Sequence, residues 1–334
     1  MNLYVHFPFC RRKCTYCALH SRAGSSVEAR ATYVASIAKE IRDLPRETIF
    51  ETVYFGGGSP ALCDLRPIFE ALRPRLAGNC EFSVELHPLD VNANTLELLK
   101  EGNVNRISMG VQSLDDATLA HMGRGYSFDT AQYAFSLIKK HFDNAGIDLI
   151  VGYPLPCDYS RLERLAQWGL VHCSVYSLIL EERSILARKL DSIELPSDDA
   201  VLDRIKHISG YLASLGLRRY EISNYAIPGL ECRYNMAVWR GEDYIGLGEG
   251  AHGRLGLTRT NSGERETVTS EADEKERRIF RLRTIEGLDA ANHPEWTRVL
   301  DKFTAEHLLA KSGSVYRLTE RGTEICDSIM VELV

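Results

Sequence analysis

The first two-thirds of the chain alternates short β-like runs with amphipathic helical stretches, and this alternation constrains the fold more than any other feature. In the first helical stretch, apolar side chains recur at helical spacing from Ala31 through Val34 and Ala38 to Ile41. Strands that alternate with helices predict parallel strands joined by right-handed crossovers. The β-like runs occupy residues 3–7, 52–55, 81–86, 106–111, 146–151 and 173–178. Six such units are too few for a closed eight-unit barrel, so we predict an α/β fold with an open or partial barrel.

The pattern changes after Ser197. A long helix is expected over residues 201–215, followed by a Gly- and aromatic-rich region at residues 220–256 and a charged stretch at residues 264–278. We therefore predict two domains, residues 1–262 and residues 263–334. At the start of the first helix, Ser25 and Glu28 have the spacing of a capping box.

Composition excludes several classes of protein. Among the 334 residues, 40 Lys and Arg face 46 Asp and Glu, a formal net charge of −6, and no long basic block occurs, which argues against nucleic acid as a partner. No apolar run approaches the length of a membrane span, and the N-terminus lacks the layout of a signal peptide. We expect a cytoplasmic chain that acts on a small molecule.

Three of the nine cysteines crowd into eight residues, as Cys10-x3-Cys14-x2-Cys17. In a reducing compartment such crowding favours metal ligation over disulfides. Iron–sulfur clusters normally have four thiolate ligands, so a loop that supplies three leaves one iron of a four-iron cluster open to an exogenous ligand. The amino and carboxylate groups of an amino-acid-like cofactor suit that iron. The other six are scattered and are expected to be small buried hydrophobes: Cys63, Cys80, Cys157, Cys173, Cys232 and Cys326.

The spacing also permits a zinc site, because His20 lies three residues past Cys17 and would complete a Cys3His ligand set. In either case Arg11, Arg12 and Lys13 are expected to help keep the thiols deprotonated.

The carboxyl ends of the later strands carry residues suited to one polar cofactor, and these ends meet at one edge of a parallel sheet. A glycine run that includes Gly57 and Gly58, followed by Ser59, permits close approach of the backbone to a ligand. A carboxylate at a strand end suits the two hydroxyls of a ribose, and an arginine at a helix end suits a carboxylate. A charge inside a strand is costly unless it is paired. The residues of these kinds are Glu85, Gln112, Arg124 and Asp148.

Taken together, these segments resemble the radical SAM superfamily, and within it the oxygen-independent coproporphyrinogen III oxidase (HemN) family and its haem-chaperone relative (HemW). The resemblance extends in order over nearly the whole chain. The matching segments are Tyr4-Val-His-Phe-Pro-Phe-Cys10, Tyr54-Phe-Gly-Gly-Gly-Ser-Pro60, Gly110-Val-Gln-Ser113 with Gly123-Arg124, Asp148-Leu-Ile-Val-Gly-Tyr-Pro154, Tyr220-Glu-Ile-Ser-Asn-Tyr-Ala226, Trp239-Arg-Gly-Glu-Asp-Tyr-Ile-Gly-Leu-Gly248, Ala251-His252 and Arg317-Leu-Thr-Glu-Arg-Gly322.

The resemblance implies a partial (β/α)6 radical SAM barrel with a small, mainly helical C-terminal domain over its mouth. It implies a [4Fe–4S] cluster on Cys10, Cys14 and Cys17, which cleaves S-adenosylmethionine and generates a 5′-deoxyadenosyl radical. Gly57, Tyr4 and Glu85 would contact that S-adenosylmethionine. A second S-adenosylmethionine, which the oxidases bind, would meet the matching positions Tyr16, Gly58, Ser59, Gln112, Arg124 and Asp148.

Three departures from these families narrow the function. The oxidases have a fourth cysteine two positions after the third, where this chain has Leu19, and a long N-terminal extension, where only nine residues precede Cys10. Both departures disfavour coproporphyrinogen decarboxylation. The chaperones typically carry His-Asn-x-x-Tyr-Trp, whereas this chain has Tyr234-Asn-Met-Ala-Val-Trp239.

We therefore expect a radical SAM enzyme of porphyrin or haem metabolism that acts on a tetrapyrrole-like substrate. An electron donor such as flavodoxin or ferredoxin would reduce its cluster. A haem chaperone and a radical methyltransferase are the alternatives, with His252 or Cys232 as candidate ligands if haem is bound.

Overall fold

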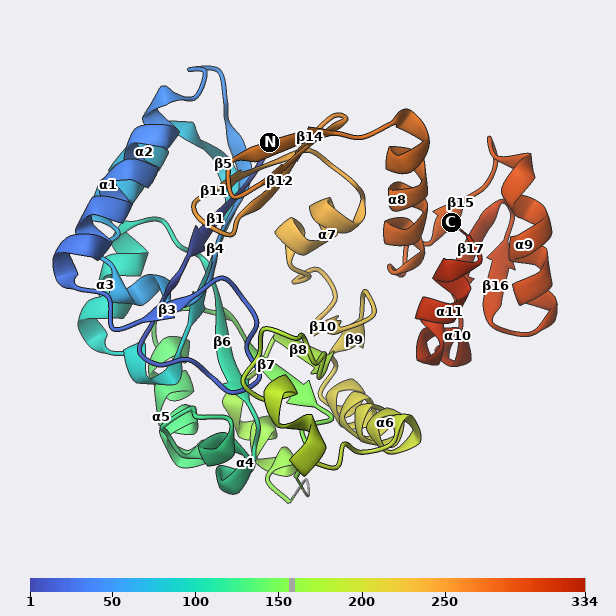
Figure 1. Cartoon of the computed structure of the whole chain (residues 1–334), viewed down its shortest axis with the longest axis horizontal. Coiled ribbons are helices and arrows are strands. Elements are labelled where there is room, and N and C mark those ends of the chain that lie inside the picture. Colours follow the sequence, from blue (N-terminus) through green and yellow to red (C-terminus); the bar gives the residue numbers. More distant parts are fainter. Residues whose placement is uncertain (156–159, 334) are drawn as a thin grey trace.

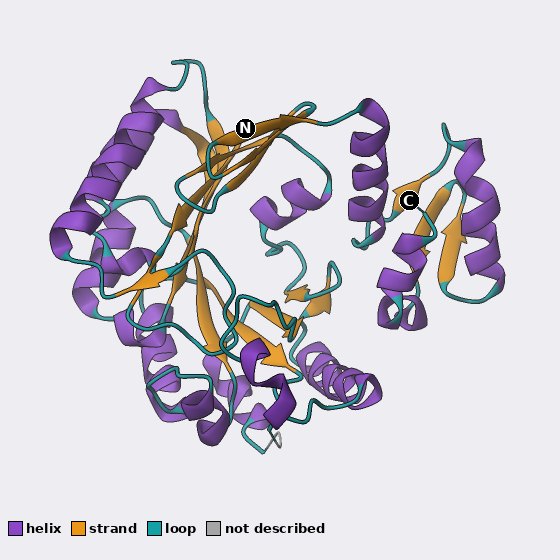
Figure 2. Ribbon diagram, viewed as in Figure 1, coloured by secondary structure: helices purple, strands orange, loops and turns teal. Residues whose placement is uncertain are grey.

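The computed structural model describes residues 1–155 and 160–333, and it contains one large curved sheet with helices along its outer face (Figure 1). Figure 2 shows these helices, in purple, on the convex side of the orange strands. The helices of this layer and of the segment that follows it are α1 (Val27–Asp43), α2 (Arg66–Leu72), α3 (Ala93–Glu101), α4 (Asp116–His121), α5 (Phe128–Lys139) and α6 (Asp198–Ser214). The long helix predicted at residues 201–215 is α6.

Six parallel strands form the centre of the sheet, and each one contains or closely overlaps a predicted run. In order they are β1 (Asn2–Phe7), β4 (Phe50–Gly57), β5 (Leu76–Leu86), β6 (Arg106–Gln112), β7 (Asn144–Val151) and β8 (His172–Ser177). Because each strand lies beside the next one in the chain, with helices in most of the connections, the predicted α/β topology is confirmed.

The sheet extends at both edges beyond the predicted strands. At one edge β11 (Tyr244–Leu247) pairs with β1 in parallel and leads into an antiparallel extension, and at the other edge β10 (Asn224–Ala226) pairs antiparallel with β8. The remaining strands at the edges are β12 (His252–Leu255), β13 (Thr258–Asn261), β14 (Glu264–Thr267) and β9 (Arg218–Arg219). Among the described residues the two edge strands, β14 and β9, do not pair with each other, so the barrel is open, as predicted.

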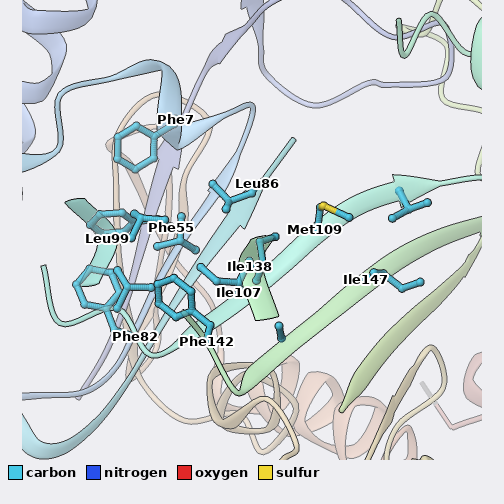
Figure 3. Packing of buried hydrophobic residues seen from close by; sticks show 14 of the residues in the cluster. Phe7, Phe55, Phe82, Leu86, Leu99, Ile107, Met109, Ile138, Phe142 and Ile147 are labelled. Atoms are coloured by element: carbon cyan, nitrogen blue, oxygen red, sulfur yellow. The ribbon is translucent and has the colours of Figure 1, made fainter. Parts of the chain in front are cut away.

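The central strands have one apolar face and one polar face. Apolar side chains such as Phe55, Phe82, Ile107 and Ile147 point to the helical layer and are fully buried there (Figure 3). The residues that alternate with these along each strand point to the concave side of the sheet. In most parallel sheets this second face is apolar too. On that side β5 carries Glu81, Ser83 and Glu85, β6 carries Arg106 and Ser108, and β7 carries Asp148. A polar concave face is suited to a polar ligand.

The structure corrects the predicted capping residue of α1 and tests the predicted burial of the scattered cysteines in part. Ser26, and not Ser25, caps α1, because its hydroxyl accepts a hydrogen bond of 3.1 Å from the Ala29 amide. The scattered cysteines are buried as predicted, except that Cys157 lies outside the described residues; those described are Cys63, Cys80, Cys173, Cys232 and Cys326.

The C-terminal part has its own apolar core, centred on Leu300, Tyr316 and Ile329. It is mainly helical, with one small antiparallel sheet, and it lies at the end of the molecule opposite α1 (Figure 1). Its elements are α8 (Ser270–Leu282), β15 (Leu288–Asp289), α9 (Pro294–Ala305), β16 (Leu309–Ser312), β17 (Val315–Leu318), α10 (Glu320–Glu324) and α11 (Cys326–Val331).

Buried ion pairs attach α8 to the large sheet, where Arg254 contacts Asp273 and, at 3.1 Å, Glu276. The domain boundary expected at residues 262 and 263 falls in the turn between the paired strands β13 and β14, and it stays a prediction. Of the helices described, none is long and apolar enough to cross a membrane.

We predict that Phe82→Ala lowers the free energy of unfolding by about 3–5 kcal/mol, because a fully buried aromatic ring is replaced by a cavity. Its ring packs against Phe55 and Phe69 at centroid distances of 4.8 and 5.8 Å. Chemical denaturation followed by circular dichroism measures the change. Tyr133→Ala, on the exposed face of α5, is the control and should change stability by less than about 0.5 kcal/mol.

Candidate cofactor site at the carboxyl ends of the strands

A cavity of about 560 Å³ lies at the carboxyl ends of the central strands. Its volume is within the range of about 300–1000 Å³ that is usual for small-molecule sites. Eleven of the twelve site residues predicted from the sequence line it: Cys10, Cys14, Tyr16, Cys17, Gly57, Gly58, Ser59, Glu85, Gln112, Arg124 and Asp148. Segments far apart in the sequence therefore meet at the place where a parallel sheet gathers its ligands.

The cysteine loop begins at β2 (Phe9–Cys10) and ends near β3 (Arg22–Ala23), which pairs with it. Backbone hydrogen bonds fix the middle of the loop, because the Thr15 amide donates to the Met122 carbonyl at 3.0 Å and the Thr15 carbonyl accepts from Leu186 at 2.8 Å. Arg124 donates to the Cys14 sulfur at 3.4 Å. The three thiols are thus presented to the cavity by a loop that is attached to several other segments.

Burial raises the pKa of the Cys10 and Cys17 thiols. The positive charge of Lys13 acts in the opposite direction, as the sequence predicted, but burial outweighs it. Arg11 is engaged elsewhere, since it forms an ion pair with the buried Asp90. A positively charged ligand at these partly buried thiols would favour their charged form.

The geometry does not favour the zinc alternative. Tetrahedral Zn–S bonds of about 2.3 Å would bring pairs of sulfurs to within about 3.8 Å of each other. Within the described residues, the cysteine sulfurs do not all lie within 4.8 Å of one another, either as a set of three or with His20. The His20 ring instead contacts Glu249 at 3.3 Å. Wider spacing of the sulfurs is compatible with a cluster of several irons, which is larger than one ion.

The glycine run packs tightly against the cysteine loop. Gly57 has a φ of +101°, and a Cβ there would lie 2.5 Å from the His6 ring. A Cβ on Gly58 would lie 2.4 Å from the Phe9 carbonyl, and the Gly58 amide donates to the Phe7 carbonyl at 2.6 Å. Glycine is therefore required at both positions to bring the end of β4 against the backbone that leads to Cys10.

Glu85 connects β5 to this glycine run. Its carboxylate accepts a hydrogen bond from the Tyr54 hydroxyl at 3.0 Å and another from the Gly57 amide at 3.1 Å. Burial, and secondarily the nearby charge of Asp148, raises the pKa of Glu85 to about 7. Each carboxylate oxygen has a second lone pair, so Glu85 can still accept hydrogen bonds from a ligand in the cavity.

Asp148 comes from β7, two strands from Glu85 in the sheet, and Arg124 follows α4; both line the same cavity as Glu85. Burial raises the pKa of Asp148, which accepts a hydrogen bond of 3.0 Å from Ser108. Arg124 donates to the Gly110 carbonyl at 2.6 Å and to the Tyr126 hydroxyl at 3.0 Å. Gln112 follows a β-bulge in β6 and has a φ of +71°, which redirects its side chain relative to the strand. A strained residue at a strand end is typical of a functional site.

Tyr4 lies apart from the other predicted residues. It lines a second, larger cavity of about 950 Å³, and its hydroxyl is hydrogen-bonded to His6 at 3.0 Å. Its ring stacks on Tyr54, the tyrosine that contacts Glu85, at a centroid distance of 6.2 Å. The two cavities adjoin, because four residues line both of them: Leu19, Tyr176, Ser177 and Ile179.

Several residues of the smaller cavity were not predicted from the sequence. Asp90 is buried and accepts hydrogen bonds from both Ser59 and Arg11. His87 is also on the wall, and burial followed by the charge of Arg124 lowers its pKa to about 3. The alternation along the strands could have indicated Tyr54 and Tyr176, since both share the polar face with Tyr4, Glu85 and Asp148. No comparable signal marks Asp90.

The two candidate haem ligands differ in position. Cys232 is fully buried, its thiol lies 3.6 Å from Glu81, and burial raises its pKa to about 12. His252 lines the larger cavity and is exposed. Of the two, only His252 is therefore accessible to a ligand.

The chain matches one family model and is similar to several named proteins and solved structures. A family model described as "Radical SAM superfamily" matches residues 4–158. The protein named "Heme chaperone HemW" from Lactococcus lactis subsp. lactis (strain IL1403) is 33% identical over 277 residues, which are 78% of this chain and 72% of that protein. The protein of the same name from Escherichia coli (strain K12) is 31% identical over 270 residues, 76% and 70% of the two chains.

Among solved structures, coproporphyrinogen III oxidase (HemN) from Escherichia coli superposes with a TM-score of 0.83. The match covers 99% of this chain and 89% of that one at 20% sequence identity. At this identity the likeness shows a common fold.

We predict that Glu85 makes a contribution to the stability of the ligand-free protein that is lost as pH rises from about 4.5 to about 7. Folding raises the pKa of Glu85, so the folded state binds this proton more tightly than the unfolded state does. Its contribution is fully present below the unfolded pKa and is lost as pH rises through the folded pKa, on the order of 3 kcal/mol. Glu85→Gln should remove this part of the pH dependence in denaturation curves, whereas Glu97→Gln, on the exposed face of α3, should leave it. An unchanged profile in the Glu85→Gln protein would contradict the assignment.

Proposed function

Since the chain belongs to the radical SAM superfamily, and within it to the family of the heme chaperone HemW and coproporphyrinogen III oxidase HemN, we propose that Cys10, Cys14 and Cys17 hold a [4Fe–4S] cluster and that the adjoining cavity binds S-adenosylmethionine. Bound together, the cluster and S-adenosylmethionine supply the one-electron chemistry that yields a 5′-deoxyadenosyl radical. An electron donor such as flavodoxin or ferredoxin is part of this proposal.

One observation carries the proposal: three partly buried thiols lie at the edge of a cavity whose wall also contains a carboxylate and a guanidinium suited to an amino-acid-like cofactor. Arg124 offers a guanidinium for a carboxylate, and Glu85 offers a carboxylate for ribose hydroxyls. The cavity of about 560 Å³ has room for such a ligand.

The side chains around the thiols have separate roles in this proposal. Arg124 contacts the Cys14 sulfur and thereby orients the cysteine loop relative to β6. Glu85 holds the glycine run through the Gly57 amide, next to the expected position of the cluster-bound cofactor. Gly58, Ser59, Tyr16, Gln112 and Asp148 remain available for further cofactor contacts, including a second S-adenosylmethionine.

The substrate of this proposed enzyme is a tetrapyrrole or a related molecule. The larger cavity, at about 950 Å³, adjoins the cofactor cavity and is near the upper limit of the usual range for small-molecule sites. Its position would bring a substrate next to the reacting end of the cofactor.

A haem chaperone is the second candidate, and the names of the two relatives favour it. In this case His252, the accessible one of the two candidate ligands, would contact the iron. The methyltransferase alternative stays a prediction that product analysis can test.

We predict that anaerobic reconstitution loads about four irons per chain and that reduction then releases 5′-deoxyadenosine from S-adenosylmethionine. Single Ala variants of Cys10, Cys14 and Cys17 should lose both the cluster absorbance and the product. Cys80→Ala, which removes a buried thiol far from the loop, is the control and should keep both. Zinc in place of iron, or iron retained by the triplet variants, would overturn the proposal.

Product analysis with a tetrapyrrole present separates the candidates. A modified tetrapyrrole together with 5′-deoxyadenosine is expected for the enzyme, and S-adenosylhomocysteine in addition would indicate the methyltransferase. A stoichiometric haem complex that His252→Ala weakens at least tenfold, with no modified tetrapyrrole, would instead favour the chaperone.

A further inference from the structure

The larger cavity lies between the barrel and the C-terminal part of the chain. Aromatic side chains form one of its walls, with Tyr4 and Tyr234 stacked at 6.1 Å and Trp239 beyond them. Residues of α10 and α11 form the opposite part of the wall. A cavity with an aromatic wall is suited to a large flat ligand.

Arg283 is a cation without an anionic partner in this cavity. It follows the last residue of α8, is half-buried, and has no carboxylate within 4 Å among residues 1–155 and 160–333. Its buried Nε has no hydrogen-bond partner in the same part of the chain. A buried donor without a partner is costly, and such groups in native structures usually meet a ligand or water.

Trp239 holds this arginine in place. The Arg283 guanidinium lies over the Trp239 ring at 4.6 Å from its centroid, and Phe280 supports the tryptophan edge-on at 5.4 Å. A cation stacked on an aromatic face has a fixed orientation and keeps its N–H groups free for a planar anion. Trp239 thus acts as a positioning residue for Arg283.

The other charged groups of the cavity leave this arginine available. Lys206 is paired with Glu324 at 3.0 Å. Arg219 donates to the hydroxyls of Thr323 and Tyr225, at 3.0 and 2.5 Å, and forms no ion pair within the described chain. Glu221 lies near Arg283 but forms no ion pair with it within 4 Å. Its Oε1 accepts from Asn224 and the Ser223 amide, its buried Oε2 has no hydrogen-bond partner among the described residues, and burial raises its pKa. The remaining charged residues of the wall are Arg183, Glu320 and Asp327.

We propose that Arg283, positioned by Trp239, binds a carboxylate of the ligand in the larger cavity, with Arg219 as a second cation nearby. The ligand class is therefore a flat aromatic molecule with carboxylate side chains, such as a carboxylated tetrapyrrole, which stacks on the aromatic wall and is anchored at this end. This inference rests on the proposed function for the identity of the ligand as a tetrapyrrole. The contact between Arg283 and a carboxylate does not depend on the [4Fe–4S] cluster.

The experiment compares coproporphyrin III with its tetramethyl ester, in which the carboxylate charges are removed by methylation, by equilibrium binding to the chain with and without iron reconstitution. The wild-type chain should bind the acid at least tenfold more tightly than the ester. Arg283→Gln should weaken binding of the acid by roughly tenfold to a hundredfold, the loss expected for a charge-assisted hydrogen bond, and leave binding of the ester unchanged. Trp239→Leu should weaken binding of the acid, and partly that of the ester, because it removes both the positioning and part of the wall.

Arg281→Gln is the matched control, since Arg281 lies two residues away and has only a weak contact of 3.7 Å with Glu286. It should bind both ligands as the wild type does. Equal affinity of the wild type for acid and ester, or an Arg283→Gln protein that distinguishes them as the wild type does, would overturn the inference. A change in thermal stability alone, with ligand selectivity intact, would mean that Arg283 only joins α8 to α7 (Arg233–Trp239). Selective binding by a chain that takes up no cluster on reconstitution would instead contradict the proposed function and support the carboxylate contact.

Discussion

The structure depends on a parallel sheet whose two faces differ in polarity. Alternate residues on β5 and β6 place Phe82 and Ile107 against the helices and Ser83 and Arg106 on the concave side. A slip of one residue would exchange the faces, so the burial of the apolar face fixes the register of the polar one. Since each strand pairs with the next in parallel, the polar side chains of all these strands lead to the same edge of the sheet. At this edge the three thiols meet the carboxylates of Glu85 and Asp148.

The strand–helix alternation made most of the fold predictable. The six central strands and α6 were found because each is long enough to show its period. The strands β11–β14 were missed, because each has only four residues and all four contain glycine, asparagine or charged residues, which mask a strand pattern. The capping residue of α1 was misplaced by one, since Ser25 and Ser26 are adjacent and only the backbone decides between them.

The candidate site was more predictable than its electrostatics. Residues at strand ends could be assigned to one edge from topology alone. Sequence could not show that Asp90 reaches back to Ser59 and Arg11, because these contacts join three separate loops. Nor could it show that burial outweighs Lys13 at the thiols, because the balance between desolvation and charge depends on depth in the fold. Tyr4 also lines a different cavity from the one to which the family resemblance assigned it.

The loss of the chaperone signature histidine has a structural counterpart. Tyr234 occupies that position, and its ring packs between Tyr4 and Tyr54, at 6.1 and 5.1 Å. Tyr54 in turn donates to Glu85 in the cofactor cavity. A ligand that stacks on Tyr234 in the larger cavity would therefore press on a wall that is continuous with the carboxylate of the smaller one. The substitution thus places an aromatic side chain where the chaperones have a potential iron ligand, and under the proposal Arg283, stacked on Trp239, would hold another part of the same ligand.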